Sequence, residues 1–88
     1  MYKLEATSRF KKSFKKLSEY QKILSRKIIT SLQNRQKLER KHKDHALKGE
    51  LKEYRECHIL PDLLPIYRYK DDVLVLNLFA IGSHSELF

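Results

Sequence analysis

The chain has 88 residues, of which 41% are hydrophobic, and its single cysteine excludes an intrachain disulfide. No apolar run approaches the roughly 20 residues that span a bilayer, and the first residues lack the apolar stretch of a signal peptide, so we expect one cytoplasmic domain, residues 1–88, with no membrane contact. The formal net charge of +8 is concentrated in residues 1–44, where 14 basic and 4 acidic residues give +10, whereas residues 45–88 carry 5 and 7, giving −2. Such a charge suits nucleic acid, an acidic partner protein or simply a solvated helical surface.

The first half of the chain predicts one strand and two helices. Apolar residues alternate over residues 2–6, which predicts a short strand. They then recur at helical spacing over residues 8–17 and 20–32, with a break at Ser18 and Glu19, which predicts two amphipathic helices whose apolar stripes face the core. Residues 38–49 are basic and are predicted to form a connection, in which His42 is a solvated side chain.

The second half switches to the period of two that is typical of strands. We predict strands at residues 54–59, 63–69 and 73–81, with turns at residues 61–62 and 71–72. The last strand is apolar on both faces and is therefore placed in the centre of the sheet, whereas Pro65 indicates an edge or a bulge in the strand before it. The expected fold is α+β in the order β-α-α-β-β-β, a small antiparallel-rich sheet with the two N-terminal helices packed on one face.

Three of the four histidines lie in short polar contexts. His45 follows an aspartate, His58 alternates with Glu56 along one strand, and His84 follows a Gly-Ser pair. Histidine titrates near neutrality, so these three, with Asp62 nearby, indicate proton transfer on a polyanion. Cleavage of RNA by its own 2′-hydroxyl needs only such acid–base and cationic groups. Each residue also has an ordinary interpretation as a loop, turn or solvent-facing position.

Metal and thiol chemistry fit the sequence less well. The spacings typical of zinc proteins, such as C-x-x-C or H-x-x-x-H, are absent. Cys57 is predicted to point away from His58, which argues against a Cys–His nucleophile. We therefore expect no metal and no cofactor.

Five strings carry a more specific signal: Asp44-His45-Ala46-Leu47-Lys48-Gly49, Arg55-Glu56-Cys57-His58, Pro61-Asp62-Leu63-Leu64, Ile66-Tyr67 and Gly82-Ser83-His84-Ser85-Glu86-Leu87-Phe88. They resemble the YafQ-type toxins of the RelE/ParE superfamily, found in bacterial type II toxin–antitoxin systems. The resemblance implies a ribosome-dependent, metal-independent endoribonuclease that cleaves mRNA in the A site. It also implies neutralisation by a cognate antitoxin, with operator DNA contacted only through that antitoxin.

The resemblance also implies site residues. It assigns catalytic acid–base and orienting roles to His45, His58, Asp62 and His84. Residues expected to bind substrate are Phe88, which the resemblance implies, and the cationic Arg55, Lys43 and Lys48.

Ala80 departs from the family pattern. The family usually has a phosphate-binding arginine two residues before the glycine of the Gly-Ser-His string, so Ala80 predicts reduced activity. Natural divergence and an engineered detoxifying substitution both explain Ala80, and we favour the second because an active toxin kills its expression host. A non-cleaving nucleic-acid- or protein-binding module and a gyrase-directed toxin stay open as alternatives.

Overall fold

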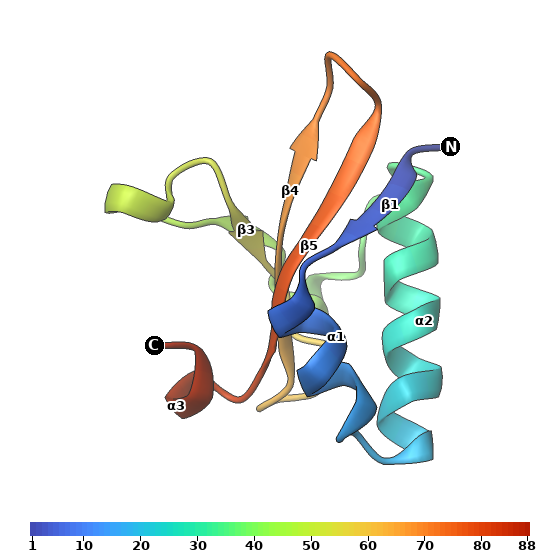
Figure 1. Ribbon diagram of the computed structural model, residues 1–88, viewed down its shortest axis with the longest axis vertical. Coiled ribbons are helices and arrows are strands. Elements are labelled where there is room, and N and C mark those ends of the chain that lie inside the picture. Colours follow the sequence, from blue (N-terminus) through green and yellow to red (C-terminus); the bar gives the residue numbers. More distant parts are fainter.

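A five-stranded sheet with two helices on one side forms the body of the molecule in a computed structural model that describes residues 1–88 (Figure 1). The elements follow in the order β1 (Lys3–Ala6), α1 (Ser8–Lys15), α2 (Glu19–Gln33), the 3-10 helix η1 (Arg40–His42), β2 (His45–Ala46), the 3-10 helix η2 (Gly49–Leu51), β3 (Arg55–Glu56), β4 (Leu64–Lys70), β5 (Val75–Gly82) and α3 (His84–Leu87). The predicted α+β class is confirmed. The short helix α3 and the strand β2 were not predicted.

Side-chain caps explain where the two long helices begin. The hydroxyl of Thr7 accepts a hydrogen bond from the backbone N–H of Phe10 and caps α1. Ser18 and Gln21 form a reciprocal capping box at the start of α2. The predicted break between the helices is therefore correct, because Ser18 satisfies backbone donors that the first turn of α2 leaves free.

The strands lie in the order β1-β5-β4-β3-β2, with β1 parallel to β5 and the other pairs antiparallel. The last long strand is in the interior of the sheet, as predicted. The strand predicted over residues 54–59 shortens to the two residues of β3, because the backbone N–H of His58 turns to the carbonyl of His42 instead of continuing the ladder. The predicted connection contains β2, and two residues are too few for any alternation to be seen.

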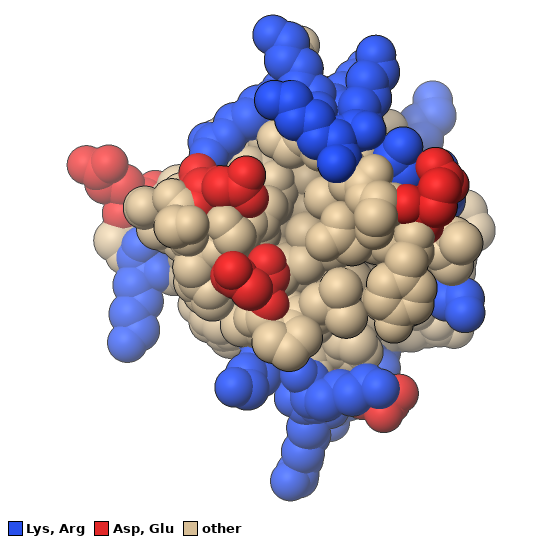
Figure 2. Space-filling view, turned by 90° about the horizontal axis from the view of Figure 1, so that it is seen from below, with Lys and Arg blue, Asp and Glu red and all other residues tan.

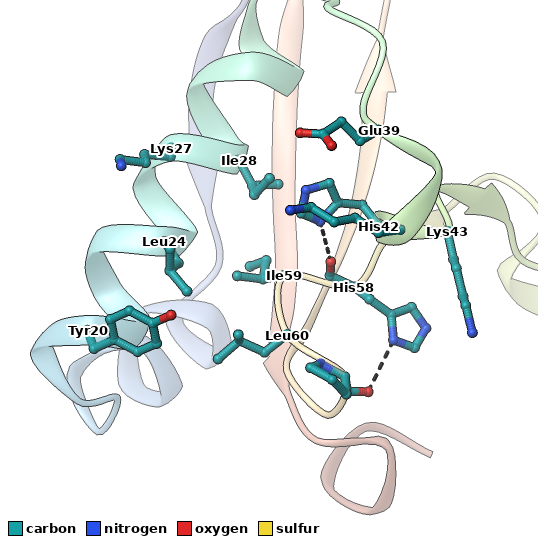
Figure 3. Close-up of a pocket in the computed structure, with 12 residues that line it drawn as sticks. Tyr20, Leu24, Lys27, Ile28, Glu39, His42, Lys43, His58, Ile59 and Leu60 are labelled. Atoms are coloured by element: carbon teal, nitrogen blue, oxygen red, sulfur yellow. Dashed lines mark hydrogen bonds between the residues drawn. The ribbon is translucent and has the colours of Figure 1, made fainter.

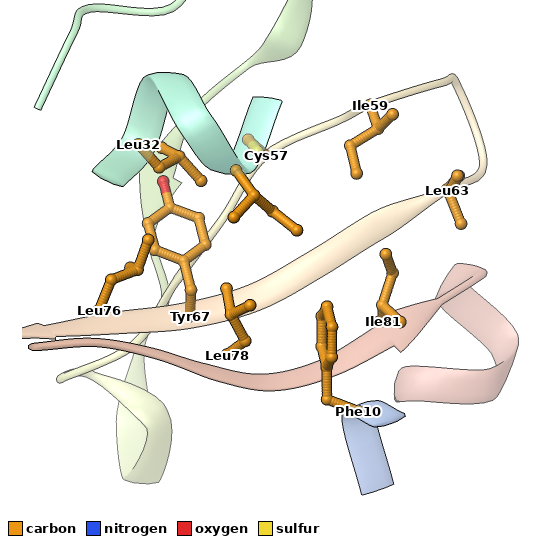
Figure 4. Packing of buried hydrophobic residues seen from close by; sticks show 10 residues of the cluster. Phe10, Leu32, Cys57, Ile59, Leu63, Tyr67, Leu76, Leu78 and Ile81 are labelled. Atoms are coloured by element: carbon orange, nitrogen blue, oxygen red, sulfur yellow. The ribbon is translucent and has the colours of Figure 1, made fainter. Parts of the chain in front are cut away.

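The helices cover the sheet face that carries the core. Phe10 of α1 and Leu32 of α2 pack with Tyr67 of β4 and Leu76 of β5 (Figure 4). The predicted packing of both helices on one face is confirmed. Cys57 belongs to this core and is fully buried, so it does point away from the polar side of its strand.

A bulge reverses the alternation of β5 near its end. Ile66 of β4 pairs with Ala80, but the next residue, Tyr67, pairs with Leu78, so Phe79 is an extra residue on β5. Ala80 therefore lies on the face opposite the helices. Pro65 lies one residue from this irregularity and beyond the two residues of β4 that pair with β3, which agrees with the prediction of an edge or a bulge.

The hairpin turn before β5 is longer than predicted. β5 begins at Val75, and Leu74 lies in the turn with a φ of 53°. Leu74 was expected to alternate with Leu76 on one strand face, but its left-handed backbone takes it out of the sheet.

Lysine and arginine side chains cluster on separate margins of the surface. Seen from the end where α3 and the α1–α2 connection lie, they occupy opposite sides of the view, with hollowed, mostly uncharged surface between them (Figure 2). No helix is both long and apolar enough to cross a membrane.

Candidate active site

The sheet places four residues in one row on the face away from the helices. His45 pairs with Glu56 between β2 and β3, Glu56 pairs with Ile66 of β4, and Ile66 pairs with Ala80 of β5. Directly paired residues project to the same side of a sheet. The unpredicted strand β2 therefore brings His45 onto the polar face that carries Glu56.

His45 lies between two oxygen acceptors. Its Nδ1 is 2.6 Å from the carbonyl oxygen of Lys43, and its Nε2 is 3.0 Å from Oε1 of Glu56. Because both ring nitrogens face acceptors, the geometry suits an imidazolium paired with a carboxylate. Glu56 is 6% exposed, and its second oxygen, Oε2, is buried with no hydrogen-bond partner.

His58 lies in the loop that follows β3. Its Nδ1 is 3.1 Å from the carbonyl oxygen of Pro61, and since a carbonyl only accepts, Nδ1 carries the proton and Nε2 keeps a free lone pair. His42 holds this loop: its Nδ1 lies 2.7 Å from the carbonyl oxygen of His58, and its own carbonyl accepts the backbone N–H of His58 (Figure 3). The prediction that His42 is merely solvated is therefore wrong.

His84 is the first residue of α3, a helix capped by a box between Ser83 and Glu86. The hydrogen bond from the backbone N–H of Ser83 lowers the pKa of Glu86 below its usual range. Asp62 accepts the backbone N–H of His84 at 3.1 Å, and its Oδ1 lies 3.6 Å from Nδ1 of the ring. The cap and Asp62 together fix the imidazole of His84.

The two histidine rings meet although they come from distant segments. The ring centroids of His58 and His84 are 5.4 Å apart, and the ring of Phe88 lies 6.2 Å from that of His84. Asp62 contacts His84, whereas His45 joins through Glu56. The structure thus brings together the four residues predicted as catalytic, with Phe88 beside them.

Glu56 is the member of this group that sequence reasoning did not select. Its position on the same strand face as His58 was the available signal, but a glutamate at such a position is usually solvated. Only the pairing of β3 with β2 and β4 shows that its side chain is buried against His45.

The three predicted cationic contacts lie elsewhere. Arg55 pairs with Tyr67 and so projects toward the helix side, where its Nε is 3.3 Å from Oδ1 of Asp44. Lys48 is exposed where η2 begins, in the projecting connection between β2 and β3 (Figure 1). Lys43 borders a groove beside α2. None of the three belongs to the histidine cluster, and their contact with substrate stays a prediction.

The fold also assembles a set of metal-ligating atoms that the sequence spacing did not indicate. Glu56, His58 and His84 each offer one ligand atom, and these atoms lie within 4.8 Å of one another. The buried, unpartnered Oε2 of Glu56 fits such a role, although ligand bonds of about 2 Å would require the three side chains to close in slightly. Spacing rules missed this set because its members come from β3, the following loop and α3.

Residues 2–88 match the model of a protein family described as a bacterial toxin of the type II toxin–antitoxin system, YafQ. The chain belongs to this family. The resemblance predicted from the five strings is therefore confirmed, and it extends over the N-terminal half, where no short motif was present.

Solved structures and a curated relative agree with this assignment. A metal-bound toxin from Helicobacter pylori is 41% identical, with a TM-score of 0.88 and complete coverage of both chains. The toxin in the DinJ–YafQ toxin–antitoxin complex of Escherichia coli is 30% identical, with a TM-score of 0.84 over 99% of this chain and 97% of that one. The mRNA interferase toxin YafQ of Escherichia coli K12 is 40% identical over 47 residues, which are 53% of this chain and 49% of that protein.

Proposed function

We propose that this YafQ-family toxin is an endoribonuclease that cleaves mRNA in the ribosomal A site. The relative named as an mRNA interferase supports the reaction class. The observation that carries the proposal is the contact of His58 with His84, in which each Nδ1 faces an oxygen acceptor and each Nε2 is left for substrate.

The surroundings of the two rings assign their roles. The neutral carbonyl of Pro61 beside His58 suits a neutral imidazole, whose Nε2 takes the proton from the 2′-hydroxyl as that oxygen attacks the adjacent phosphorus. The carboxylate of Asp62 beside His84 suits an imidazolium, whose Nε2 gives its proton to the departing 5′-oxygen. The products are a 2′,3′-cyclic phosphate and a free 5′-hydroxyl, so the protons balance without a metal.

His45 and Phe88 complete the proposed site. The His45 imidazolium, held by Glu56, offsets negative charge that develops on the phosphorane. The ring of Phe88, 61% exposed beside His84, is placed to contact a substrate base. A metal ion bound at Glu56, His58 and His84 would supply Lewis-acid chemistry instead, and no step of the proposed cleavage uses one.

The proposed partners are the ribosome with its mRNA and a cognate antitoxin. The Escherichia coli relative in complex with DinJ supports the antitoxin. In this proposal the toxin acts in the cytoplasm and reaches operator DNA only through the antitoxin.

A non-cleaving binding module of the same fold is the second candidate function. Ala80 favours it, because the family's phosphate-binding arginine is missing from the row that carries Glu56. A gyrase-directed toxin is less favoured, because such a function does not require the paired histidines.

Primer extension on an mRNA that is being translated in a cell extract tests the proposal. The chain and its Ala80→Arg form are each compared with His58→Gln and His84→Gln variants, and with Lys52→Ala, an exposed loop residue, as the matched control. We expect cleavage within codons that requires translation and falls about 10²–10⁴-fold in either histidine variant. Absence of cleavage by both parent forms, with ribosome binding retained, would establish the binding module instead. Inhibition of gyrase without cleavage would establish the third function.

A further inference from the structure

A groove separate from the histidine rings lies beside α2. It has a volume of about 710 Å³ and is bounded by residues 20–28 of α2, residues 39–43 around η1 and residues 58–61 of the loop after β3. We call this region the α2 groove. Figure 3 shows that the ring of His58 points away from α2, whereas Ile59 points toward Leu24 across the groove.

The floor of the α2 groove is aliphatic. Leu24 and Ile28 of α2 face Ile59 and Leu60 of the loop. At one end the floor continues into Tyr20, which is 64% exposed. A hydrophobic strip that remains open after the core has formed is typical of a surface that binds another protein.

The rim of the α2 groove is basic. Lys27 lies on the side of α2, and Lys41 and Lys43 lie on the side of η1, with Glu39 as the one acidic residue of the lining. The arrangement complements an amphipathic segment that has apolar side chains on one face and carboxylates along its edges.

We propose that the α2 groove is the docking site for an acidic, amphipathic segment of the antitoxin. The segment seats apolar side chains on the aliphatic floor and pairs its carboxylates with Lys27, Lys41 and Lys43. This inference rests on the proposed function only in naming the antitoxin as the partner. RNA is the less suitable occupant, because proteins hold single-stranded bases on aromatic rings and the floor has none beyond Tyr20.

The groove shares a wall with the proposed catalytic centre. The loop of residues 58–61 contributes Ile59 and Leu60 to the groove and holds the His58 ring on its outer side through the Pro61 carbonyl. The next residue, Asp62, orients His84. A segment pressed against this loop therefore contacts the backbone that positions both catalytic rings without entering the space between them.

Amide chemical-shift mapping on the full-length, ¹⁵N-labelled chain tests the docking site. The probe is the purified full-length antitoxin encoded beside the toxin gene. We expect the largest shifts at residues 20–28 and 58–61, together with a shift of the His58 imidazole signals. Largest shifts on another face, or no binding of that antitoxin, would overturn the proposal.

Charge reversal provides the matched variants. Lys27→Glu with Lys41→Glu should weaken antitoxin binding about tenfold or more, and Tyr20→Ala should weaken it in the same direction. Lys11→Glu with Lys15→Glu changes the net charge equally on α1, outside the groove, and should alter the affinity by no more than about twofold. Melting curves verify that each variant is folded. Equal losses in both double variants would show that only overall charge matters and would remove the groove as the site.

A third arm separates the occupants and the two proposals. A non-cleavable 2′-deoxy oligonucleotide that shifts the same groove residues while the antitoxin does not would assign the groove to nucleic acid and overturn the inference. Antitoxin docking in the groove without any mRNA cleavage would retire the proposed reaction and leave the docking site standing. Cleavage without docking there would do the reverse.

Discussion

Leu74 adopts a backbone conformation that leucine rarely takes. Its φ is 53°, in the left-handed region, within the turn between β4 and β5, and its side chain is 58% exposed. A left-handed L-residue with a Cβ costs roughly 1–2 kcal/mol, and asparagine tolerates this region better than leucine. Packing of the hairpin ends overrides the local preference of the residue.

We predict that Leu74→Asn stabilises the fold by about 1 kcal/mol, which corresponds to roughly 4–8 °C in melting temperature for a domain of this size. Val73 is the matched control, because it is equally exposed in the same turn but has no positive φ. Val73→Asn should give no gain. Thermal unfolding followed by circular dichroism compares the two, and an equal gain in both would mean that strain at Leu74 is not the cause.

Ala80 lies in the row that contains Glu56, with only Ile66 between them. Adjacent strands are about 4.8 Å apart, so a long side chain at position 80 can reach toward Glu56, whose Oε2 has no partner. An arginine there would have a buried carboxylate to pair with and a charge directed at the scissile phosphate.

We predict that the chain as it stands is folded and weakly toxic or non-toxic, and that Ala80→Arg restores ribosome-dependent cleavage and growth arrest. The gain should be on the order of 10²–10³ in rate, the usual effect of one transition-state donor. Because Ala80 is fully buried, the larger side chain should also cost about 1–3 kcal/mol of stability. Growth curves and primer extension measure activity, and urea unfolding measures the cost.

Ala80→Met is the control for this substitution, because it adds bulk to the same buried position without adding a charge. It should lower stability and leave toxicity low. If the Ala80 form is already fully toxic, or if Ala80→Arg gains nothing, the interpretation of Ala80 as an inactivating residue is wrong.

At the scale of the element, α3 depends on one side chain for its position. Glu86 accepts the backbone N–H of Ser83, and a Cβ added at Gly82 would come within 2.9 Å of the same carboxylate. The helix has only four residues and starts with His84. Loss of the cap should therefore displace a catalytic imidazole without disturbing the core.

We predict that Glu86→Ala lowers cleavage by the Ala80→Arg form about tenfold or more while changing the melting temperature little, because catalysis tolerates small misplacements poorly. Glu86→Gln should retain most activity, since Gln21 already serves in the capping box of α2. The folded pKa of Glu86 is lowered, so the cap is intact above the usual glutamate range and weakens as pH falls through it. Activity below that range should fall less in Glu86→Gln than in the parent.

The same scale explains which elements could be predicted. α1 and α2 extend over enough residues for their helical period and caps to be visible, and β4 and β5 over enough for alternation. Strands β2 and β3 have two residues each, so they exist only through their pairing partners.

At the scale of the whole molecule, buried acidic groups make the fold sensitive to alkali. Burial, followed by the nearby carboxylates of Asp44 and Glu56, raises the pKa of Cys57 to about 12. Burial and a hydrogen bond to Asp44 also raise the pKa of Tyr67, which lies in the same core. The folded chain therefore keeps protons that the unfolded chain releases.

We predict that the free energy of unfolding is constant near pH 8 and falls as pH rises above about 9, the ordinary range of the thiol, toward about 12. The sign follows because the unfolded state binds fewer protons in that interval. At pH 10 the contribution of Cys57 should be a loss of about 1 kcal/mol. Urea titrations at pH 8 and pH 10 measure the loss, and Cys57→Ala should decline less steeply. An equal decline in both forms would assign the effect to the tyrosines alone.

The amino-acid sequence by itself determined the two amphipathic helices, the long strands, the interior place of β5 and the residue types of the site. These features follow from local periodicity, from side-chain caps and from short motifs that a single segment contains. The same local information identified His45, His58, Asp62 and His84 as candidates for chemistry.

Only the tertiary structure decided how those residues meet. The bulge at Phe79 turns Ala80 to the face of Glu56, strand pairing buries Glu56 against His45, and His42 supports the loop of His58. None of these contacts is visible in the sequence, because each joins segments far apart along the chain, and one extra residue in a strand reverses every side chain that follows it.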